Sequence, residues 1–469
     1  MRRWFSLFLS ILLVLGLMAC GNTAAQPTQP EVESWLKAGF ARVDITPAYN
    51  IGLDGSGNAT TRISKGIADH LYMTCVALSD GEKTILVYTA DTLGFNNTSL
   101  PLLRNQIRMA TGIPQEQVFF GATHTHSAPR LTTNSGDTFI KYYGSFCAAA
   151  VQAAEEAIAD MAPAKLQAMT KDLQGMNFVR HYKMSDGSYA GPNFGTFTGL
   201  DIVDYAGEVD PELSMIKLDR GGDKQDILML NWQAHPNNSS SLGYYLISAD
   251  FVGKLRDKME AQTGMQVAYF TGASGNVHID SKIASDAHGL KWDAYGEKLA
   301  DLAMEALPEL KDVGGTGIAV TGQYYLAQID HSMDHMLAQA QEVYNLWGTE
   351  SKAAADEKGL EYDFTSVYQA KTIVERAQIG KELQWELRAF RVGDLGFTTG
   401  TYEMFTESGK YVKDNSPFDV TFVITGNLIY IPNEAAFAYR NYEADTTYFV
   451  PGTAELLAEE YVKMLRSLK

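Results

Sequence analysis

FFGATHTHSAP, residues 119–129, is the stretch around which the rest of the 469-residue chain is organised. Its apolar start predicts a buried strand, and His124 and His126 follow where that strand ends. Residues two apart in extended backbone point to the same side, so both imidazoles can reach one metal ion, or one can reach a metal and the other a substrate. The pair alone also fits two polar histidines at a strand end.

The composition is that of an ordinary soluble globular protein, with 45% hydrophobic and 20% charged residues. The length suits one large or two medium domains. A formal net charge of −18 argues against a nucleic-acid partner, because phosphate binding needs basic surface, and it also disfavours attraction to an anionic membrane. Cys75 and Cys147 have apolar neighbours and no CxxC spacing, which predicts buried thiols without a disulfide.

The first twenty residues resemble a bacterial lipoprotein signal peptide. Arg2 and Arg3 precede an apolar run, which ends in the lipobox-like LMAC at Cys20. We therefore expect a signal peptide at 1–19, a lipidated Cys20 with a polar tether over 20–36, and one catalytic domain over 37–469. This predicts an extracytoplasmic protein, lipid-anchored to the bacterial cell membrane without a transmembrane helix; the alternative is a plain secretory signal with a chance cysteine.

Three strand–turn–strand patterns organise the remaining chain. They span 72–78 with 84–89, 214–218 with 226–232, and 387–392 with 395–399. Each pattern ends next to a side chain with ligand chemistry: Asp91, His235 and Glu403. Helices are expected over 100–111, 139–161, 250–262, 295–310, 333–359 and 452–468, the segment 333–359 as an acidic surface excursion. Mixed strands with flanking helices predict an α/β fold whose ligand site lies at strand ends.

Several motifs, in this order along the chain, resemble the neutral (non-lysosomal) ceramidases and their shorter bacterial homologues. They are ARVDITP at 41–47, ATHTHSAP at 122–129, HP at 235–236 with ISADF at 247–251, GASGNV at 272–277, and a C-terminal block from SPF at 416–418 through YIP at 430–432 to YE at 442–443. The resemblance covers Gly39 to about Leu468. It implies a neutral-ceramidase-like α/β catalytic domain, with mixed sheets and flanking helices.

The resemblance implies a zinc ion held by two histidines, a glutamate and a tyrosine. Carried over by motif, these ligands are His124, His235, Glu403 and Tyr430, and His126 faces the scissile amide, although His124 and His126 can exchange roles. Zinc lowers the pKa of water and polarises a carbonyl, which suits amide hydrolysis. Without the resemblance, Glu403 fits a solvated strand-end carboxylate and Tyr430 a core aromatic.

The catalytic half of the site departs from the family at one position. Arg180 and Tyr442 match residues that bind the substrate carbonyl and would stabilise its oxyanion, whereas Arg180 alone also fits a surface ion pair. The family carries a serine nucleophile where this chain has His278, and Ser274 lies too early in the loop to match it. We therefore expect zinc-bound water as the nucleophile, with His278 or His126 as general base or acid.

These expectations converge on a zinc-dependent amidohydrolase acting on a linear N-acyl amide, small-molecule or lipid, with sphingolipids among the candidates. Because the chain ends soon after the catalytic motifs, the immunoglobulin-like C-terminal domain of longer relatives is expected to be missing. The alternatives are another metallo-esterase or deacylase on the same fold, and a non-catalytic ligand-binding lipoprotein, which the His278 substitution favours.

Overall fold

The computed structural model describes residues 36–469 apart from 57–58, 96–98, 133–135, 284–286 and 427–428. The described residues belong to one compact unit. The expected signal peptide, Cys20 and nearly all of the tether lie outside the described residues. Among the described helices, none combines the length and the apolar character needed to cross a membrane.

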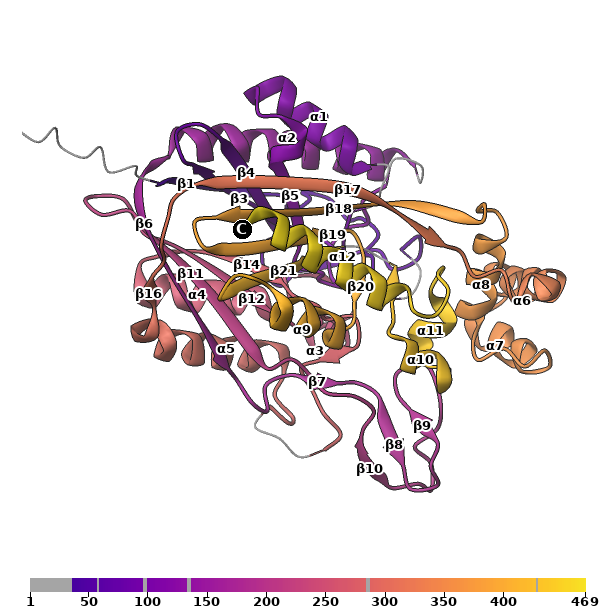
Figure 1. The fold of residues 1–469 in the computed structure, drawn as a ribbon. Helices are drawn as coiled ribbons and strands as arrows, with labels where there is room; N and C mark the ends of the chain where they lie inside the picture. Colours follow the sequence, from indigo (N-terminus) through magenta and orange to yellow (C-terminus); the bar gives the residue numbers. More distant parts are fainter. Residues whose placement is uncertain (1–35, 57–58, 96–98, 133–135, 284–286, 427–428) are drawn as a thin grey trace, which may run out of the picture. The chain divides into compact units, whose positions relative to one another are not determined.

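A large mixed sheet forms the centre of this unit (Figure 1). Its strands are ordered β14-β12-β11-β6-β1-β3-β4-β5, with β16 added beside β6. Their bounds are β1 Leu36–Asp44, β3 Tyr72–Ser79, β4 Thr84–Ala90, β5 Val118–Ala122, β6 Ala162–Asp172, β11 Glu212–Asp219, β12 Ile227–Trp232, β14 Gln266–Thr271 and β16 Lys311–Asp312. Most neighbours are antiparallel, but β4 with β5 and β12 with β14 are parallel.

A second sheet has the order β17-β18-β19-β21. Its strands are β17 Ile318–Gln328, β18 Glu382–Val392, β19 Leu395–Gly400 and β21 Val420–Thr425. It packs face to face on the large sheet through an apolar core, in which the rings of Phe119 and Phe390 lie 4.2 Å apart between centroids. Burying this core between two sheets supplies much of the stability of the unit, at about 25 cal/mol per Å² of apolar surface.

Helices cover the outer faces of both sheets (Figure 1). The large sheet is covered by α1 Ser99–Thr111, α2 Asp137–Ala159, α4 Phe251–Thr263 and α5 Trp292–Ala306, and the small sheet by α9 Thr406–Asn415 and α12 Thr453–Leu468. The alanines of α2 allow a very close approach to β1: a Cβ at Gly39 would lie 2.0 Å from the carbonyl oxygen of Ala157. The result is a four-layer α/β arrangement, which confirms the predicted fold class.

Short strand pairs and helices outside these layers carry most of the remaining chain. The pairs are β2 Gly66–Ile67 with β13 Leu246–Ile247, β7 Phe178–Val179 with β15 Val277–His278, and β20 Glu403–Met404 with β22 Tyr430–Ile431; β8 Tyr182–Met184, β9 Tyr189–Ala190 and β10 Ile202–Tyr205 form a small sheet. The helices are α3 Ser239–Leu242, α6 Leu337–Thr349, α7 Lys352–Leu360, α8 Val367–Arg376, α10 Glu434–Ala438 and α11 Tyr442–Thr446.

The three predicted hairpins form as β3–β4, β11–β12 and β18–β19, and both predicted thiols are free and buried. The expected helix over 333–359 is wrong in one respect: it divides into α6 and α7, because the Ser351 side chain accepts a hydrogen bond from the amide of Ala354 and starts a new helix there. Strands β6 and β17 had no counterpart in the prediction.

Candidate metal centre and active-site cavity

Three histidine side chains and one carboxylate meet where strands of both sheets end. His124 follows β5, His235 follows β12, and Glu403 opens β20 just after β19. The Nε2 atom of His235 lies 3.0 Å from Nε2 of His124 and 3.0 Å from Nε2 of His126. The Oε2 atom of Glu403 lies 3.3 Å from Nε2 of His124 and 3.7 Å from Nε2 of His235. All four side chains are buried.

Backbone carbonyls fix the proton on each of these imidazoles. The Nδ1 atoms contact carbonyl oxygens as follows: His124 that of Leu93 at 2.6 Å, His126 that of Gly55 at 2.7 Å, and His235 that of Ser274 at 3.1 Å. Carbonyls only accept hydrogen bonds, so each Nδ1 carries a hydrogen, and in its neutral form each ring presents a lone pair at Nε2. A hydrogen bond from the other ring nitrogen to a carbonyl oxygen is typical of metal-ligating histidines.

This arrangement fits a cation. Lone pairs facing each other at 3.0 Å repel, and a metal ion among them converts the repulsion into coordination. Oε2 of Glu403 is buried and, among the described residues, has no hydrogen-bond donor. Buried carboxylate oxygens normally have a partner, so the orphaned oxygen points to a missing positive charge. Two imidazole nitrogens with a carboxylate oxygen form a donor set that zinc prefers.

His126 differs from the other two histidines in its access to solvent space. A cavity of about 900 Å³ is lined by His126, Glu403, Tyr430 and Tyr442, whereas His124 is not part of its described lining. Burial, reinforced by the neighbouring imidazoles, holds the pKa of His126 well below its usual range, so the ring is neutral at pH 7. Its Nε2 lone pair therefore lies between the cluster and the cavity.

The backbone around the cluster is shaped for close approach. His124 adopts a φ of +66°, a left-handed conformation that costs a non-glycine residue about 1 kcal/mol. Gly55, with a φ of +89°, lies against His126, and a Cβ at this position would be 2.6 Å from Cγ of that ring. Glycine at position 55 therefore lets the loop backbone approach the His126 ring closely.

A buried ion pair anchors Arg180 beside the cluster. The pairing of β7 with β15 brings Arg180 next to His278, and Oε1 of Glu443 accepts from both Nε, at 2.7 Å, and Nη2 of the guanidinium. Nη2 also contacts the Tyr430 hydroxyl at 3.2 Å. Although burial opposes it, the charges of Arg180 and His181 hold the pKa of Glu443 at about 2. Arg180 is thus held as a fixed cation rather than a surface group.

His278 faces this guanidinium. Its Nε2 atom lies 3.5 Å from Nη1 of Arg180, and its ring centroid lies 6.0 Å from that of His235. Burial and the positive charge of Arg180 lower the pKa of His278 to about 3. Of the eight predicted site residues, the structure brings His124, His126, His235 and Glu403 into one cluster. It places the other four around that cluster: Arg180, His278, Tyr430 and Tyr442.

An aromatic wall leads from this cluster to the cavity mouth, and sequence reasoning missed most of it. Tyr344, Trp347, Tyr368 and Tyr442 line the cavity with Tyr430. Consecutive ring centroids in this series lie 6.2, 5.4, 5.6 and 5.9 Å apart. The first three rings belong to α6 and α8, within or just after the segment expected to be an acidic surface excursion. Their helical spacing resembled ordinary core packing, so no sequence signal separated the two uses.

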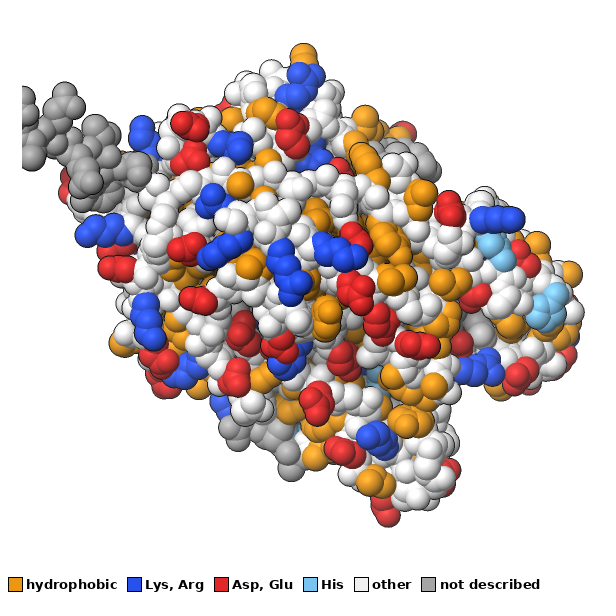
Figure 2. Space-filling view, in the orientation of Figure 1, with side chains coloured by type: hydrophobic (Ala, Val, Ile, Leu, Met, Phe, Trp, Pro, Cys, Tyr) orange, Lys and Arg blue, Asp and Glu red, His pale blue; other side chains and the backbone are white. Residues whose placement is uncertain are grey.

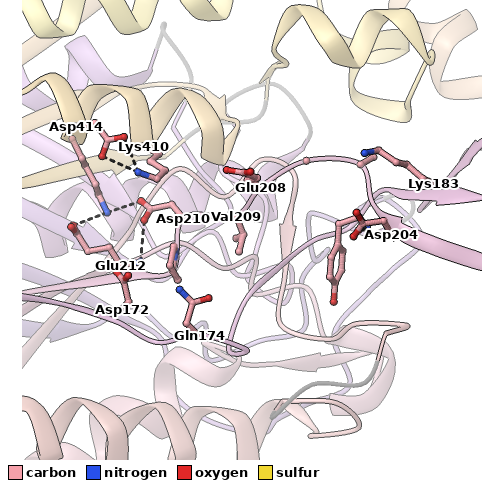
Figure 3. Close-up of a pocket in the computed structure, with 15 residues that line it drawn as sticks. Asp172, Gln174, Lys183, Asp204, Glu208, Val209, Asp210, Glu212, Lys410 and Asp414 are labelled. Carbon is pink, nitrogen blue, oxygen red and sulfur yellow. Dashed lines mark hydrogen bonds and ion pairs between the residues drawn. The ribbon is translucent and has the colours of Figure 1, made fainter.

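Two other charged features have structural explanations. Asp91, grouped above with residues of ligand chemistry, instead accepts two hydrogen bonds from Arg256 at 3.0 and 2.6 Å and so ties α4 to the end of β4. A second cavity, of about 660 Å³, is rich in charged side chains (Figure 3). Two of its three lysines pair within it: Lys413 lies 2.9 Å from Asp210, and Lys410 is turned toward Asp414 at 2.7 Å.

Comparisons with known proteins agree with this fold. The profile of the family described as neutral/alkaline non-lysosomal ceramidase, N-terminal, matches residues 36–278. The fold is similar to that of a neutral ceramidase from Pseudomonas aeruginosa, with a TM-score of 0.67 and 16% identity over 93% of this chain and 75% of that one. A ceramidase complexed with C2 gives a TM-score of 0.67 and 15% identity with the same coverage. No curated protein sequence matches the chain.

Proposed function

Because this chain belongs to the neutral/alkaline non-lysosomal ceramidase family, we propose that it is a zinc-dependent hydrolase of the N-acyl amide bond in ceramide-type lipids. Membership of the family makes it a hydrolase of the ceramidase type. The observation that carries the metal proposal is the set of bare Nε2 atoms around the orphaned Oε2 of Glu403. Zinc bound there would polarise the amide carbonyl and lower the pKa of the attacking water.

In this proposal His124, His235, Glu403 and Tyr430 hold the metal. Glu403 contacts both His124 and His235 within 3.7 Å, and no such contact to His126 occurs among the described residues. Tyr430 pairs with Glu403 across β20 and β22, so its side chain starts from the same end of the cavity. The remaining imidazole, His126, faces the cavity and is assigned to the substrate side.

Arg180 and Tyr442 act on the carbonyl oxygen. Arg180 is a permanent cation whose position is set by Glu443, so it can stabilise negative charge on the oxygen without rearranging. Burial raises the pKa of Tyr442, so its phenol stays protonated and can donate a hydrogen bond to the same oxygen. In this proposal His126, which lines the cavity, takes a proton from the attacking water.

The function is tested by release of fatty acid from a panel of N-acyl substrates, with and without a chelator, alongside elemental analysis of the protein. We expect one zinc per chain and chelator-sensitive release of fatty acid. His124→Ala and His235→Ala should lose both metal and activity. A metal-free wild-type protein would refute the zinc proposal. Cleavage of esters but not amides would favour the alternative of a metallo-esterase on this fold.

A parallel comparison separates metal ligands from the substrate-side group. His126→Ala should keep its zinc and lose turnover, because its ring faces the cavity rather than Glu403. Tyr430→Phe should weaken zinc binding, since it removes an oxygen ligand. If His126→Ala loses its zinc and Tyr430→Phe keeps it, these two residues exchange roles, and the ligand set becomes three imidazoles with Glu403.

A further inference from the structure

Four large apolar side chains are exposed together at the rim of the active-site cavity. We call them the rim patch: Ile63, Ile67, Tyr244 and Tyr245, with exposed fractions of 39, 48, 40 and 38%. Single exposed apolar residues are common and need no explanation, whereas a group of them in one place marks an interaction surface.

Two short segments of backbone hold the rim patch in place. Strands β2 and β13 pair in parallel, with Ile67 opposite Ile247. One step earlier the amide of Lys65 donates to the carbonyl of Tyr245 at 2.8 Å, which extends the contact between the segments. The four apolar side chains therefore come from adjoining backbone, although they are about 180 residues apart in sequence.

The rim patch is joined to the cavity wall by the buried side chain of Arg62. Its Nε donates to the carbonyl of Tyr244 at 2.7 Å, and its Nη1 donates to the carbonyls of Asp54 at 3.0 Å and His126 at 2.7 Å. Asp54 and His126 both line the cavity. One guanidinium thus spans from the rim patch to the substrate side of the candidate metal centre.

The one exposed charged side chain in the two segments that carry the rim patch is basic, opposite in sign to the net charge of the whole chain. The segments 55–68 and 237–249 contain no acidic residue, although the chain has 56 Asp and Glu and a formal net charge of −18. Of their two charged residues, Arg62 is buried and Lys65 is exposed, with its Nζ 4.0 Å from the ring centroid of Tyr245. The half-buried carboxylate of Asp69, just beyond the first segment, is turned inward to Ser248 and to the amide of Ala249. By contrast, acidic and basic side chains are interspersed over the face drawn in Figure 2.

Exposed tyrosines beside cations on an apolar surface are the composition that proteins use at the interface between lipid head groups and acyl chains. Lys65 makes no ion pair with any described residue, so its ammonium is available to phosphate groups. Near a membrane surface each such cation adds favourable attraction to anionic lipids. A lipid surface therefore satisfies the apolar side chains and the cation together.

We propose that the rim patch seats the enzyme on a phospholipid surface that contains anionic lipids, with the mouth of the cavity beside the contact. Ile63, Ile67, Tyr244 and Tyr245 enter the head-group region, and Lys65 contacts lipid phosphates. This inference rests on the proposed function, because a lipid amide reaches the cavity most directly from such a surface. It also explains how a strongly acidic protein engages anionic lipid: through an exposed apolar patch that carries one lysine and no exposed carboxylate of its own segments.

The test is co-sedimentation with vesicles of phosphatidylcholine and phosphatidylglycerol, using the chain from Trp35, which forms a compact unit without the preceding residues. Ile67→Ser with Tyr245→Ser should lower the vesicle partition coefficient at least tenfold. The matched control is Tyr324→Ser with Leu326→Ser on β17, which are 65 and 57% exposed and should leave partitioning unchanged. Circular dichroism and thermal unfolding check the fold of each variant.

A single charge reversal keeps the test decisive if the double variant unfolds. Lys65→Glu should weaken partitioning to vesicles with phosphatidylglycerol several-fold and should remove most of its salt dependence. Wild-type partitioning in Lys65→Glu and in the folded rim variant would overturn the proposal, and so would an equal loss in the β17 variant.

The docking proposal and the proposed function fail in different ways. Vesicle partitioning is measured without turnover. If the protein cleaves no N-acyl amide but still needs the rim patch for partitioning, the docking proposal stands and the proposed function is refuted. If the protein releases fatty acid from detergent-dispersed substrate but does not partition to vesicles, the proposed function stands and the docking proposal is refuted. Activity on detergent-dispersed substrate should be the same in wild type and in the rim variants.

Discussion

Replacing Glu443 by alanine is expected to lower the free energy of unfolding by about 3–5 kcal/mol, because it leaves a buried cation without a counter-charge. The Arg180 and Glu443 side chains are 5 and 0% exposed. The carboxylate accepts from Nε and Nη2 of Arg180 through Oε1 and from Nε2 of His181, at 2.9 Å, through Oε2. Its loss therefore removes the carboxylate acceptor of three N–H donors, two of which belong to the permanent charge of Arg180.

The pKa of Glu443 gives a second route to the magnitude. Its fall from 4.5 to about 2 on folding corresponds, at 1.36 kcal/mol per unit, to about 3 kcal/mol of stability. A depressed folded-state pKa contributes fully above the unfolded value and is lost as pH falls through the folded one. The advantage of wild type over Glu443→Ala should therefore be constant at neutral pH and should shrink between about pH 4.5 and 2.

Urea unfolding followed by fluorescence measures this loss at several pH values. The matched control is Asp414→Ala, which removes the exposed partner of Lys410 on α9 and should cost about 0.5 kcal/mol or less. Glu443→Gln, which keeps the shape and one acceptor, should lie between the two. A Glu443→Ala protein within 1 kcal/mol of wild type at pH 7, or a difference that does not shrink on acidification, would refute the reasoning.

Three further predictions concern the cluster itself. Gly55→Ala should reduce both metal content and fatty-acid release, because its Cβ would lie 2.6 Å from Cγ of His126. The control is Gly81→Ala, at a position that is also left-handed but has nothing within 4 Å of the added Cβ. It should lower the free energy of unfolding by about 1–2 kcal/mol, measured by thermal unfolding, and leave the metal in place. Dialysis against a chelator should lower Tm and re-addition of zinc should restore it, since a metal at 100 times its Kd stabilises the native state by about 2.7 kcal/mol; an unchanged Tm would speak against a site formed by folding. His278→Ser should keep its zinc by elemental analysis, because Nε2 of His278 faces Arg180; loss of zinc would instead make His278 a ligand.

The parts of the fold that the sequence predicted are those encoded by neighbouring residues. The β3–β4 and β18–β19 hairpins have alternating or continuous apolar strands joined by a Gly/Asp turn, and both formed with those turns. Strand β6 alternates apolar and polar residues over 164–168, but two of its three apolar positions there are alanine, so the signal is weak, and its place depends on pairing with β1 and β11. Edge strand β17 exposes much of its length, so its apolar pattern is weak.

The candidate site likewise has parts that the sequence predicted and parts that it did not. The His124–His126 motif was visible locally, and the ordered motifs of the family supplied His235, Glu403 and Tyr430. The partnership of Arg180 with Glu443 was not predictable, because the two residues are 263 positions apart and neither sequence neighbourhood encodes the pairing. The aromatic wall was hidden for the converse reason: Trp347 has the helical spacing of a core residue, and only the fold turns it toward a cavity.

The surroundings of His278 decide what the chain can do at the position where the resemblance implies a serine. With a pKa of about 3 its ring is neutral at pH 7, so it cannot act there as a general acid. Its Nε2 lone pair faces Nη1 of Arg180, a group that only donates, and so is not directed at a substrate. His126 contributes the imidazole found in the described cavity lining, and its Nε2 is bare. We infer that replacing the serine moves proton transfer to His126 and leaves His278 to position Arg180, which favours attack by water over an acyl-enzyme.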